Sequence, residues 1–265
     1  MAVVALASTG ALLAAEAWVF GDLGGFPLDD SWIHLVFARS LAAGEGLAFA
    51  PGQLVAATTA PLWTALLALV ASLGAPLPLA TKLLGAAAYV LGVDASYRLG
   101  RALGLVPARA AFAAALVLAT DWLLWSSTSG MEVPLFVWLS LEGIGRHVEE
   151  RRAALAGGAP APVSFLIFAL AALARPEGLL LLVLAFADRA ILPVRDGDGL
   201  RLARPRLATL ALGVLVAALV IAPVALAFAS ASGSPLPTTL AAKSSAPPAW
   251  SPDLKFLRAV LGILF

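Results

Sequence analysis

Two adjacent carboxylates, Asp29 and Asp30, open the longest polar-bearing interruption in an otherwise apolar chain, the stretch from Phe26 to Trp63. They follow a first hydrophobic segment, at the point where a chain leaving a bilayer would enter water. A carboxylate within hydrogen-bond reach of a hydroxyl can take its proton as that hydroxyl attacks an electrophile. The pair therefore predicts general-base chemistry at a membrane surface. The alternative is that Asp30 caps a helix starting at Ser31 while Asp29 is solvated, but capping uses only one of the two carboxylates.

A histidine, His34, lies four residues after Asp30, which is one turn of a helix. Side chains at this spacing share a helix face. His34 is therefore either a hydrogen-bond partner of Asp30 or a ligand of substrate or metal.

Charged residues in three later polar turns are candidates for the same site. Arg175 and Lys243 are cations that suit a phosphate group, because positive charge stabilises negative charge that develops in a transition state. Each candidate also has a structural alternative. Arg175 can pair with Glu177, Lys243 can sit in a mobile loop, and Glu132 can cap the helix that starts near Pro134.

Composition places the chain in a membrane. It has 265 residues, of which 61% are hydrophobic and 12% charged, and its mean hydropathy is +0.95. Soluble domains carry about twice that share of charge. With about 20 residues per span, the length allows roughly seven or eight transmembrane helices. The predicted fold class is an all-α, polytopic transmembrane helix bundle, formed by one domain over residues 1–265.

Composition also excludes several kinds of site. The net charge is +1 and the basic residues are dispersed, which gives no indication of a nucleic-acid partner. The absence of cysteine excludes disulfides, thiolate nucleophiles and cysteine-based zinc sites. Nothing in the sequence decides whether a divalent cation is needed, because an Asp pair serves either a cation site or general-base chemistry alone.

Hydrophobic segments separated by turns define the elements that must position these residues. The first segment lacks a basic start and a cleavage site, so we interpret it as a transmembrane helix and not a signal peptide. After the Asp pair, Ile33, Val36, Phe37 and Leu41 predict one apolar stripe on a short surface helix. Pro176 separates the two short apolar runs Val163–Ala174 and Gly178–Ile191, which indicates a helical hairpin or one kinked helix. The expected helical segments are Ala2–Phe20, Ser31–Ala43, Pro61–Leu73 (non-crossing), Ala80–Leu99, Ala110–Trp125, Pro134–Gly145, Val163–Ala174, Gly178–Ile191, Leu207–Ala229 and a last run from Leu254.

Charge asymmetry between the loops predicts the topology. If the first loop, residues 21–60, is external, the three basic loops that begin near Arg98, Arg146 and Arg189 all lie inside, as the positive-inside rule requires. The same assignment brings the Asp pair, Glu132, Arg175 with Glu177, and Lys243 to the external face. An outward-facing active site in a bacterial inner membrane is therefore expected.

Four motifs in this order resemble the GT-C superfamily of membrane glycosyltransferases, which use polyprenyl-phosphate sugars. They are PLDDSWIHLVFARSLAAGEGLAFAPGQ followed by TTAPLW, then SGMEVPLF, ARPEGLLL and SPLPTTLAAK. The resemblance implies a polyprenyl-phosphate sugar donor, an acceptor hydroxyl on a lipid, polysaccharide or protein, and an interfacial first external loop. It implies Asp29 as the general base and Asp30 as its helper, although the sequence does not order the two. Family members usually continue with more spans and often a soluble domain, so we expect this chain to be an N-terminal fragment.

A secondary transporter, or another non-enzymatic polytopic protein, is the alternative from a different class. Transporters place charged residues and broken helices near the middle of the membrane, often in repeated halves. No repeat is visible in this sequence, and its main charged groups fall in loops. The sequence therefore favours the enzyme.

Overall fold

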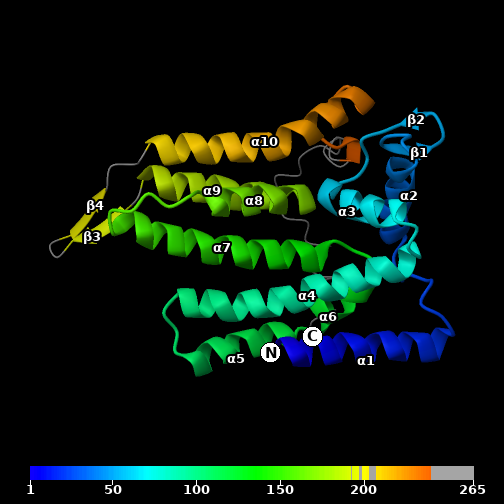
Figure 1. The fold of residues 1–265 in the computed structure, drawn as a ribbon, viewed down its shortest axis with the longest axis horizontal. Coiled ribbons are helices and arrows are strands. Elements are labelled where there is room, and N and C mark those ends of the chain that lie inside the picture. The colour runs from blue at the N-terminus through cyan, green and yellow to red at the C-terminus, as the bar shows by residue number, and fades with distance from the viewer. Residues whose placement is uncertain (192, 197–198, 203–206, 240–265) are drawn as a thin grey trace, which may run out of the picture.

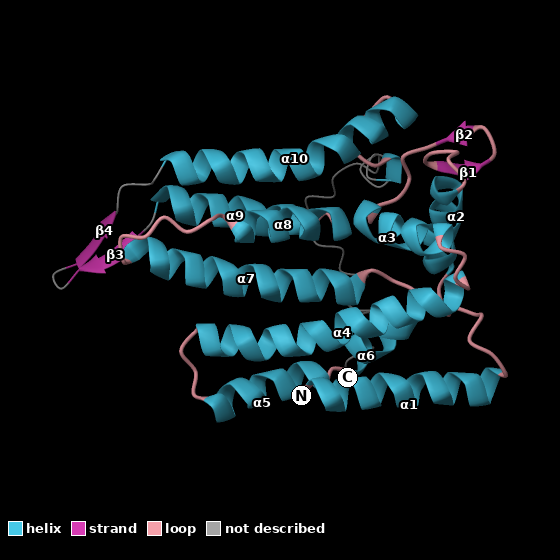
Figure 2. Ribbon diagram, in the orientation of Figure 1, coloured by secondary structure: helices cyan, strands magenta, loops and turns pink. Residues whose placement is uncertain are grey.

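The computed structural model describes residues 1–191, 193–196, 199–202 and 207–239. Helices form nearly all of its regular structure, which confirms the predicted all-α class (Figure 2). The two short antiparallel hairpins are β1 (Ala48–Ala50) with β2 (Gln53–Leu54), and β3 (Pro193–Asp196) with β4 (Gly199–Leu202). The helices are α1 (Ala2–Phe20), α2 (Asp29–Ala42), α3 (Pro61–Ser72), α4 (Leu77–Ala102), α5 (Pro107–Leu118), α6 (Asp121–Thr128), α7 (Val133–Leu155), α8 (Val163–Ala174), α9 (Gly178–Ile191) and α10 (Leu207–Ser232).

The long helices lie side by side along one direction, whereas α2 crosses them at one end of the bundle (Figure 1). Helices α2 and α3 and the β1–β2 hairpin gather at this end, and we call it the α2 end. The chain runs toward it in α1, α8 and α10 and away from it in α4, α7 and α9 (Figure 1). Turns distant in sequence therefore meet at the α2 end.

Among the described residues, three helices are long and apolar enough to cross a membrane: α1, α4 and α10. The pair α5 and α6 would make a fourth if counted as one bent span. The apolar side chains of α1 and α10 are mostly exposed. Exposed apolar surface of this extent is costly in water. These helices support a membrane protein, with fewer full-length spans than the chain length alone allows.

The predicted segment Ala110–Trp125 is broken. Helices α5 and α6 meet at a bend of 58°. The break is stabilised at Asp121, whose Oδ1 accepts a hydrogen bond of 2.7 Å from the backbone N–H of Trp122. This carboxylate satisfies a backbone donor at the start of α6, which has no partner within its own helix.

Helix α7 continues to Leu155, so the predicted end near Gly145 is wrong. The polar residues after Gly145 lie on the helix, and several of them are paired there. Arg146 Nε lies 2.9 Å from Glu142 Oε1, and Glu150 accepts hydrogen bonds from Ser164 on α8 and from Arg189 on α9. These partners allow a charged segment to remain helical.

The two short runs around Arg175-Pro176-Glu177 form a helical hairpin, with the predicted bounds. The Phe165 ring of α8 lies 4.5 Å from the Phe186 ring of α9, and a Cβ on Gly178 of α9 would lie 2.4 Å from the backbone nitrogen of Ala172 of α8. Residues early in α8 thus lie beside residues late in α9, and residues late in α8 lie beside residues early in α9. This is the arrangement of antiparallel helices. Of the two predicted alternatives, the structure shows the hairpin and not one kinked helix. The hairpin turn points toward the α2 end (Figure 1).

The apolar stripe predicted for α2 is wrong except at Phe37. Ile33, Val36 and Leu41 are only half buried. The buried face instead includes two polar residues, Ser31 and His34, together with Leu35, Phe37 and Ala38. Helix α2 starts at Asp29 and its N-cap residue is Leu28, so the proposed capping role of Asp30 is also wrong.

The close packing of α4 on α6 depends on Gly85. A Cβ atom at this position would lie 2.2 Å from the backbone carbonyl oxygen of Ser127. We expect Gly85→Ala to lower the free energy of unfolding by about 1–3 kcal/mol, because an overpacked backbone contact cannot relax easily. Gly10→Ala in α1 is the control, since a Cβ there has no neighbour within 4 Å, and alanine favours a helix by up to about 1 kcal/mol. Thermal unfolding in detergent tests both, and equal melting temperatures would contradict the close packing.

Candidate functional site

The carboxylate of Glu132 lies between the guanidinium of Arg175 and the ring of His34 at the α2 end. Arg175 Nη1 donates a hydrogen bond of 2.7 Å to Glu132 Oε1, and His34 Nε2 lies 3.2 Å from Glu132 Oε2. The other terminal nitrogen of Arg175, Nη2, donates a hydrogen bond of 3.0 Å to Glu177 Oε1. The side chains of Glu132 and His34 are only 4% and 7% exposed, whereas that of Glu177 is 58% exposed. Residues from α2, from the turn before α7 and from the α8–α9 hairpin thus form one ionic cluster.

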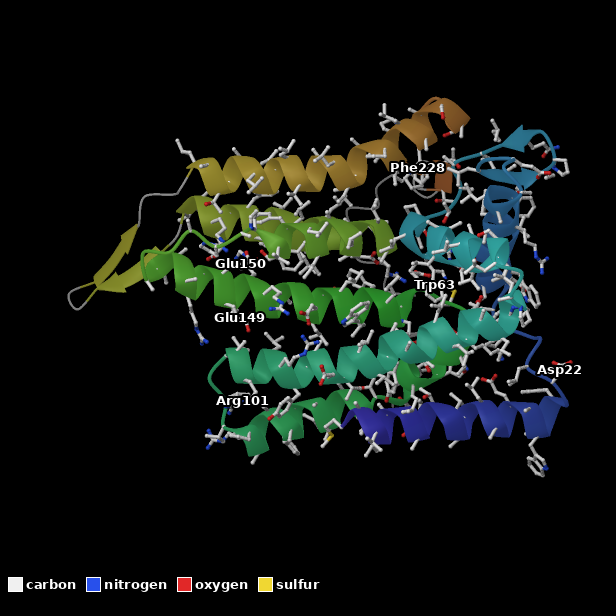
Figure 3. The ribbon with its side chains drawn as sticks, in the orientation of Figure 1. Asp22, Trp63, Arg101, Glu149, Glu150 and Phe228 are labelled. Carbon is white, nitrogen blue, oxygen red and sulfur yellow. The ribbon has the colours of Figure 1, made fainter. Side chains whose placement is uncertain are left out.

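The turn that carries Glu132 is held by the first segment of the chain. The Ser31 hydroxyl donates a hydrogen bond of 2.6 Å to the Ser129 carbonyl. The indole N–H of Trp63 donates a hydrogen bond of 3.0 Å to the Gly130 carbonyl. Gly130 has φ +87°, and a Cβ there would lie 2.8 Å from both Phe26 and Ser31. Only glycine fits this position. Figure 3 shows Trp63 on α3, close to the start of α7.

The electrostatics of the cluster favour charged side chains. Burial alone would raise the pKa of Glu132, but the His34 ring and the Arg175 guanidinium outweigh it and hold that pKa below its ordinary value. Burial would lower the pKa of Arg175, but Glu177 and Glu132 together raise it. Glu132 is therefore an anion at neutral pH.

Two polar atoms of the ionic cluster have no hydrogen-bond partner among the described residues. They are His34 Nδ1 and Glu132 Oε2, both fully buried. The contact between His34 Nε2 and Glu132 Oε2 is within ion-pair distance but lacks hydrogen-bond geometry. The cluster therefore keeps unused donor and acceptor capacity beside Arg175.

A cavity of about 400 Å³ opens beside this cluster. Glu132, Arg175 and Glu177 form its polar part. The remainder is mainly apolar and comes from α9, α10 and the segment after α10, including Leu179, Ile221, Val224, Phe228 and Leu236. Figure 3 shows Phe228 on α10 at the α2 end. The cavity therefore suits an amphiphile with an anionic group and an apolar tail.

The structure brings together four of the predicted site residues, His34, Glu132, Arg175 and Glu177. His34 contacts Glu132 and not Asp30, so the predicted i,i+4 pair is wrong. Arg175 pairs with Glu177, as its structural alternative predicted, and also with Glu132. Glu132 occupies the N-cap position of α7 without a side-chain capping bond. Lys243 lies outside the described residues.

The Asp pair occupies the first turn of α2. Both Asp29 and Asp30 are exposed, and neither makes a side-chain hydrogen bond or ion pair with another described residue. A helix N-terminus stabilises negative charge in its first turn. Their place on the helix that carries His34 puts them at the same end of the bundle as the cavity.

Sequence reasoning missed a second buried ion pair. Lys82 of α4 pairs with Glu16 of α1, and Thr128 donates a hydrogen bond of 2.6 Å to the other oxygen of Glu16. Lys82 also lies over the Phe26 ring, 5.5 Å from its centroid. The available signal was a charged residue within each of two apolar segments, Glu16 and Lys82, because such residues seldom lie within membranes without a partner.

Across the part of the chain that the structure describes, no group of three or more His, Asp or Glu side chains is arranged to hold a metal ion. The comparisons with known proteins found no matching family model, curated protein or solved structure. The site must therefore be interpreted from its own geometry.

Glu132 and Glu177 both contact Arg175 but differ in burial, so they form a matched pair for mutation. We expect Glu132→Gln to lower the free energy of unfolding by about 3–5 kcal/mol, because it leaves the Arg175 charge without its buried partner. Glu177→Gln removes an exposed partner and should cost less than about 1 kcal/mol. Denaturant unfolding in mild detergent measures both, and similar losses in the two variants would contradict the central position of Glu132.

Acid should weaken this cluster. Because the folded-state pKa of Glu132 lies below its ordinary value of 4.5, its charge stabilises the folded state above pH 4.5 and this contribution is lost as the pH falls through the folded pKa. We expect the melting temperature of the unmodified chain to fall more steeply below pH 4.5 than that of Glu132→Gln. Parallel pH profiles of the two proteins would show that Glu132 is not the titrating group.

Proposed function

We propose that this chain is an integral-membrane glycosyltransferase of the GT-C type, which transfers a sugar from a polyprenyl-phosphate donor to an acceptor hydroxyl. The observation that carries the proposal is the cavity of about 400 Å³, which combines an apolar wall with Arg175. Such a cavity suits a donor with one phosphate and a long apolar chain.

In this proposal Arg175 binds the donor phosphate and the apolar wall binds the first prenyl units. Arginine presents several N–H donors in a planar fork that fits phosphate oxygens. Its two carboxylate partners differ, since Glu132 is buried and Glu177 is largely exposed. The donor phosphate would replace Glu177 at Nη2, while Glu132 holds the guanidinium in place.

Asp29 is proposed as the general base and Asp30 as its helper, with the order of the two left open. As the acceptor oxygen attacks the anomeric carbon, the bond from that carbon to the phosphate oxygen breaks and the acceptor proton passes to the carboxylate. The leaving group is a phosphate whose second pKa is about 6, so it departs without a general acid. Attack opposite the leaving group inverts the anomeric centre.

The distribution of arginines supports an external position for this site. Arg98, Arg101, Arg146, Arg152 and Arg189 lie in the parts of α4, α7 and α9 away from the α2 end. Basic residues accumulate on the cytoplasmic side of membrane proteins. We therefore propose that the α2 end faces the periplasm or exterior.

A secondary transporter is the second candidate, and two observations favour it. One is the 58° break between α5 and α6, because broken helices are common in transporters. The other is the buried pair of Glu16 and Lys82, since charged residues within a membrane often mark a substrate or ion path.

Substitution of the Asp pair tests the enzyme. With a polyprenyl-phosphate sugar as donor, we expect Asp29→Asn or Asp30→Asn to reduce turnover by at least about 100-fold, the usual contribution of a general base. Both residues are exposed, so the variants should fold normally. Glu45→Gln is the control, because it removes another exposed carboxylate from the same external segment.

Two outcomes would reject parts of the proposal. Full turnover in both asparagine variants would remove the Asp pair from catalysis. Absence of turnover in the unmodified chain, together with solute flux in proteoliposomes that Lys82→Met abolishes, would favour the transporter.

A further inference from the structure

A second basic cavity lies toward the end of the bundle opposite α2, between α4 and α7. Its volume is about 470 Å³. Figure 3 shows Arg101 and Glu149, two of its lining residues, near the end of the bundle where α4 ends. Six charged residues line the cavity: Arg98, Arg101, Arg146, Arg152, Glu142 and Glu149.

Two of the arginines, Arg101 and Arg152, lie at the end of the lining farthest from the middle of the bundle. Helices α4 and α7 run in the same direction (Figure 1), and Ala95 and Leu141 form the apolar part of the lining nearest the middle of the bundle. At about 1.5 Å per residue, Arg101 lies about 9 Å beyond Ala95, and Arg152 about 16 Å beyond Leu141. The cavity therefore places hydrocarbon beside Arg98 and Glu142 at its inner part, and Arg101 and Arg152 at its outer part.

The carboxylates of the cavity neutralise only part of its positive charge. Glu142 lies 2.7 Å from Arg98 and 2.9 Å from Arg146, and Glu149 lies 3.4 Å from Arg146. No described carboxylate pairs with Arg101 or Arg152. Four arginines against two glutamates leave the lining with a net charge of +2. Asp94, which is outside the lining and 2.8 Å from Arg98, reduces the local charge to +1.

We propose that this cavity binds the phosphate headgroup of an anionic phospholipid. Arginine nitrogens suit phosphate oxygens because they form paired, charge-assisted hydrogen bonds. Arg101 lies in the last turn of α4, a candidate span, where headgroups would be expected, and basic pockets between helices on the cytoplasmic side of a membrane bind such headgroups. The apolar part near Ala95 and Leu141 would contact the start of an acyl chain. This site is separate from the proposed glycosyltransferase site.

Binding is tested with the full chain in detergent and phosphatidylglycerol as the probe. Phosphatidylglycerol should raise the melting temperature and remain bound in native mass spectrometry. We expect Arg152→Gln and Arg101→Gln each to weaken binding about fivefold, the effect of one basic residue near an anionic surface. Arg152 is the cleaner variant, because the Arg101 guanidinium also donates a hydrogen bond to the Leu105 carbonyl.

The matched control is Arg109→Gln, which removes the same charge from the start of α5. Arg109 is exposed and lies outside the cavity lining. The Arg109→Gln variant should therefore bind phosphatidylglycerol with unchanged affinity. Equal weakening in Arg109→Gln and Arg152→Gln would overturn the site in favour of general surface charge. Equal stabilisation by phosphatidylcholine, or by inorganic phosphate alone, would overturn the assignment to an anionic lipid.

Discussion

The buried carboxylate of Glu132 is the constraint on which the α2 end depends. An ionised carboxylate removed from water is costly unless charged partners compensate it. Here the partners come from elements far apart in the chain, namely His34 on α2 and Arg175 after α8. The turn that carries Glu132 is held in turn by Ser31 and Trp63. The charge of Glu132 therefore links α2 to the turn before α7 and to the turn after α8, in addition to the apolar core that these helices share.

Elements that depend on residues close together in the sequence could be predicted, whereas features that depend on distant partners could not. Helices α8 and α9 were predicted with their observed bounds, because Pro176 and the apolar runs beside it act locally. The end of α7 was placed too early, because the charges after Gly145 resemble a loop until their partners on α8 and α9 are known. The break before Asp121 left no clear signal, since neither proline nor glycine marks it.

The members of the ionic cluster were predictable from the sequence, and so was the pair of Arg175 with Glu177, but the contacts of Glu132 were not. His34, Glu132, Arg175 and Glu177 were all named from sequence, because charged residues are rare in an apolar chain and each stands in a polar turn or near one. The partner of His34 was not predictable, because a rule about neighbours four residues apart assigns it to Asp30. The structure instead places its ring beside Glu132. The polar face of α2 has the same origin, since Ser31 is buried to bind a carbonyl 98 residues away in sequence.

The segment that follows α10 has a consequence for biosynthesis. Thr238 donates its backbone N–H to the Ala56 carbonyl at 2.8 Å, and its side chain donates to the same oxygen across 182 residues. The neighbouring residues Leu236 and Thr239 complete the wall of the cavity that contains Arg175. Because a chain emerges from the ribosome with its N-terminus first, α2 and α3 are made long before this wall. The cavity is therefore completed only after α10 has been synthesised, and the nascent chain passes through an interval in which its polar cluster is still open.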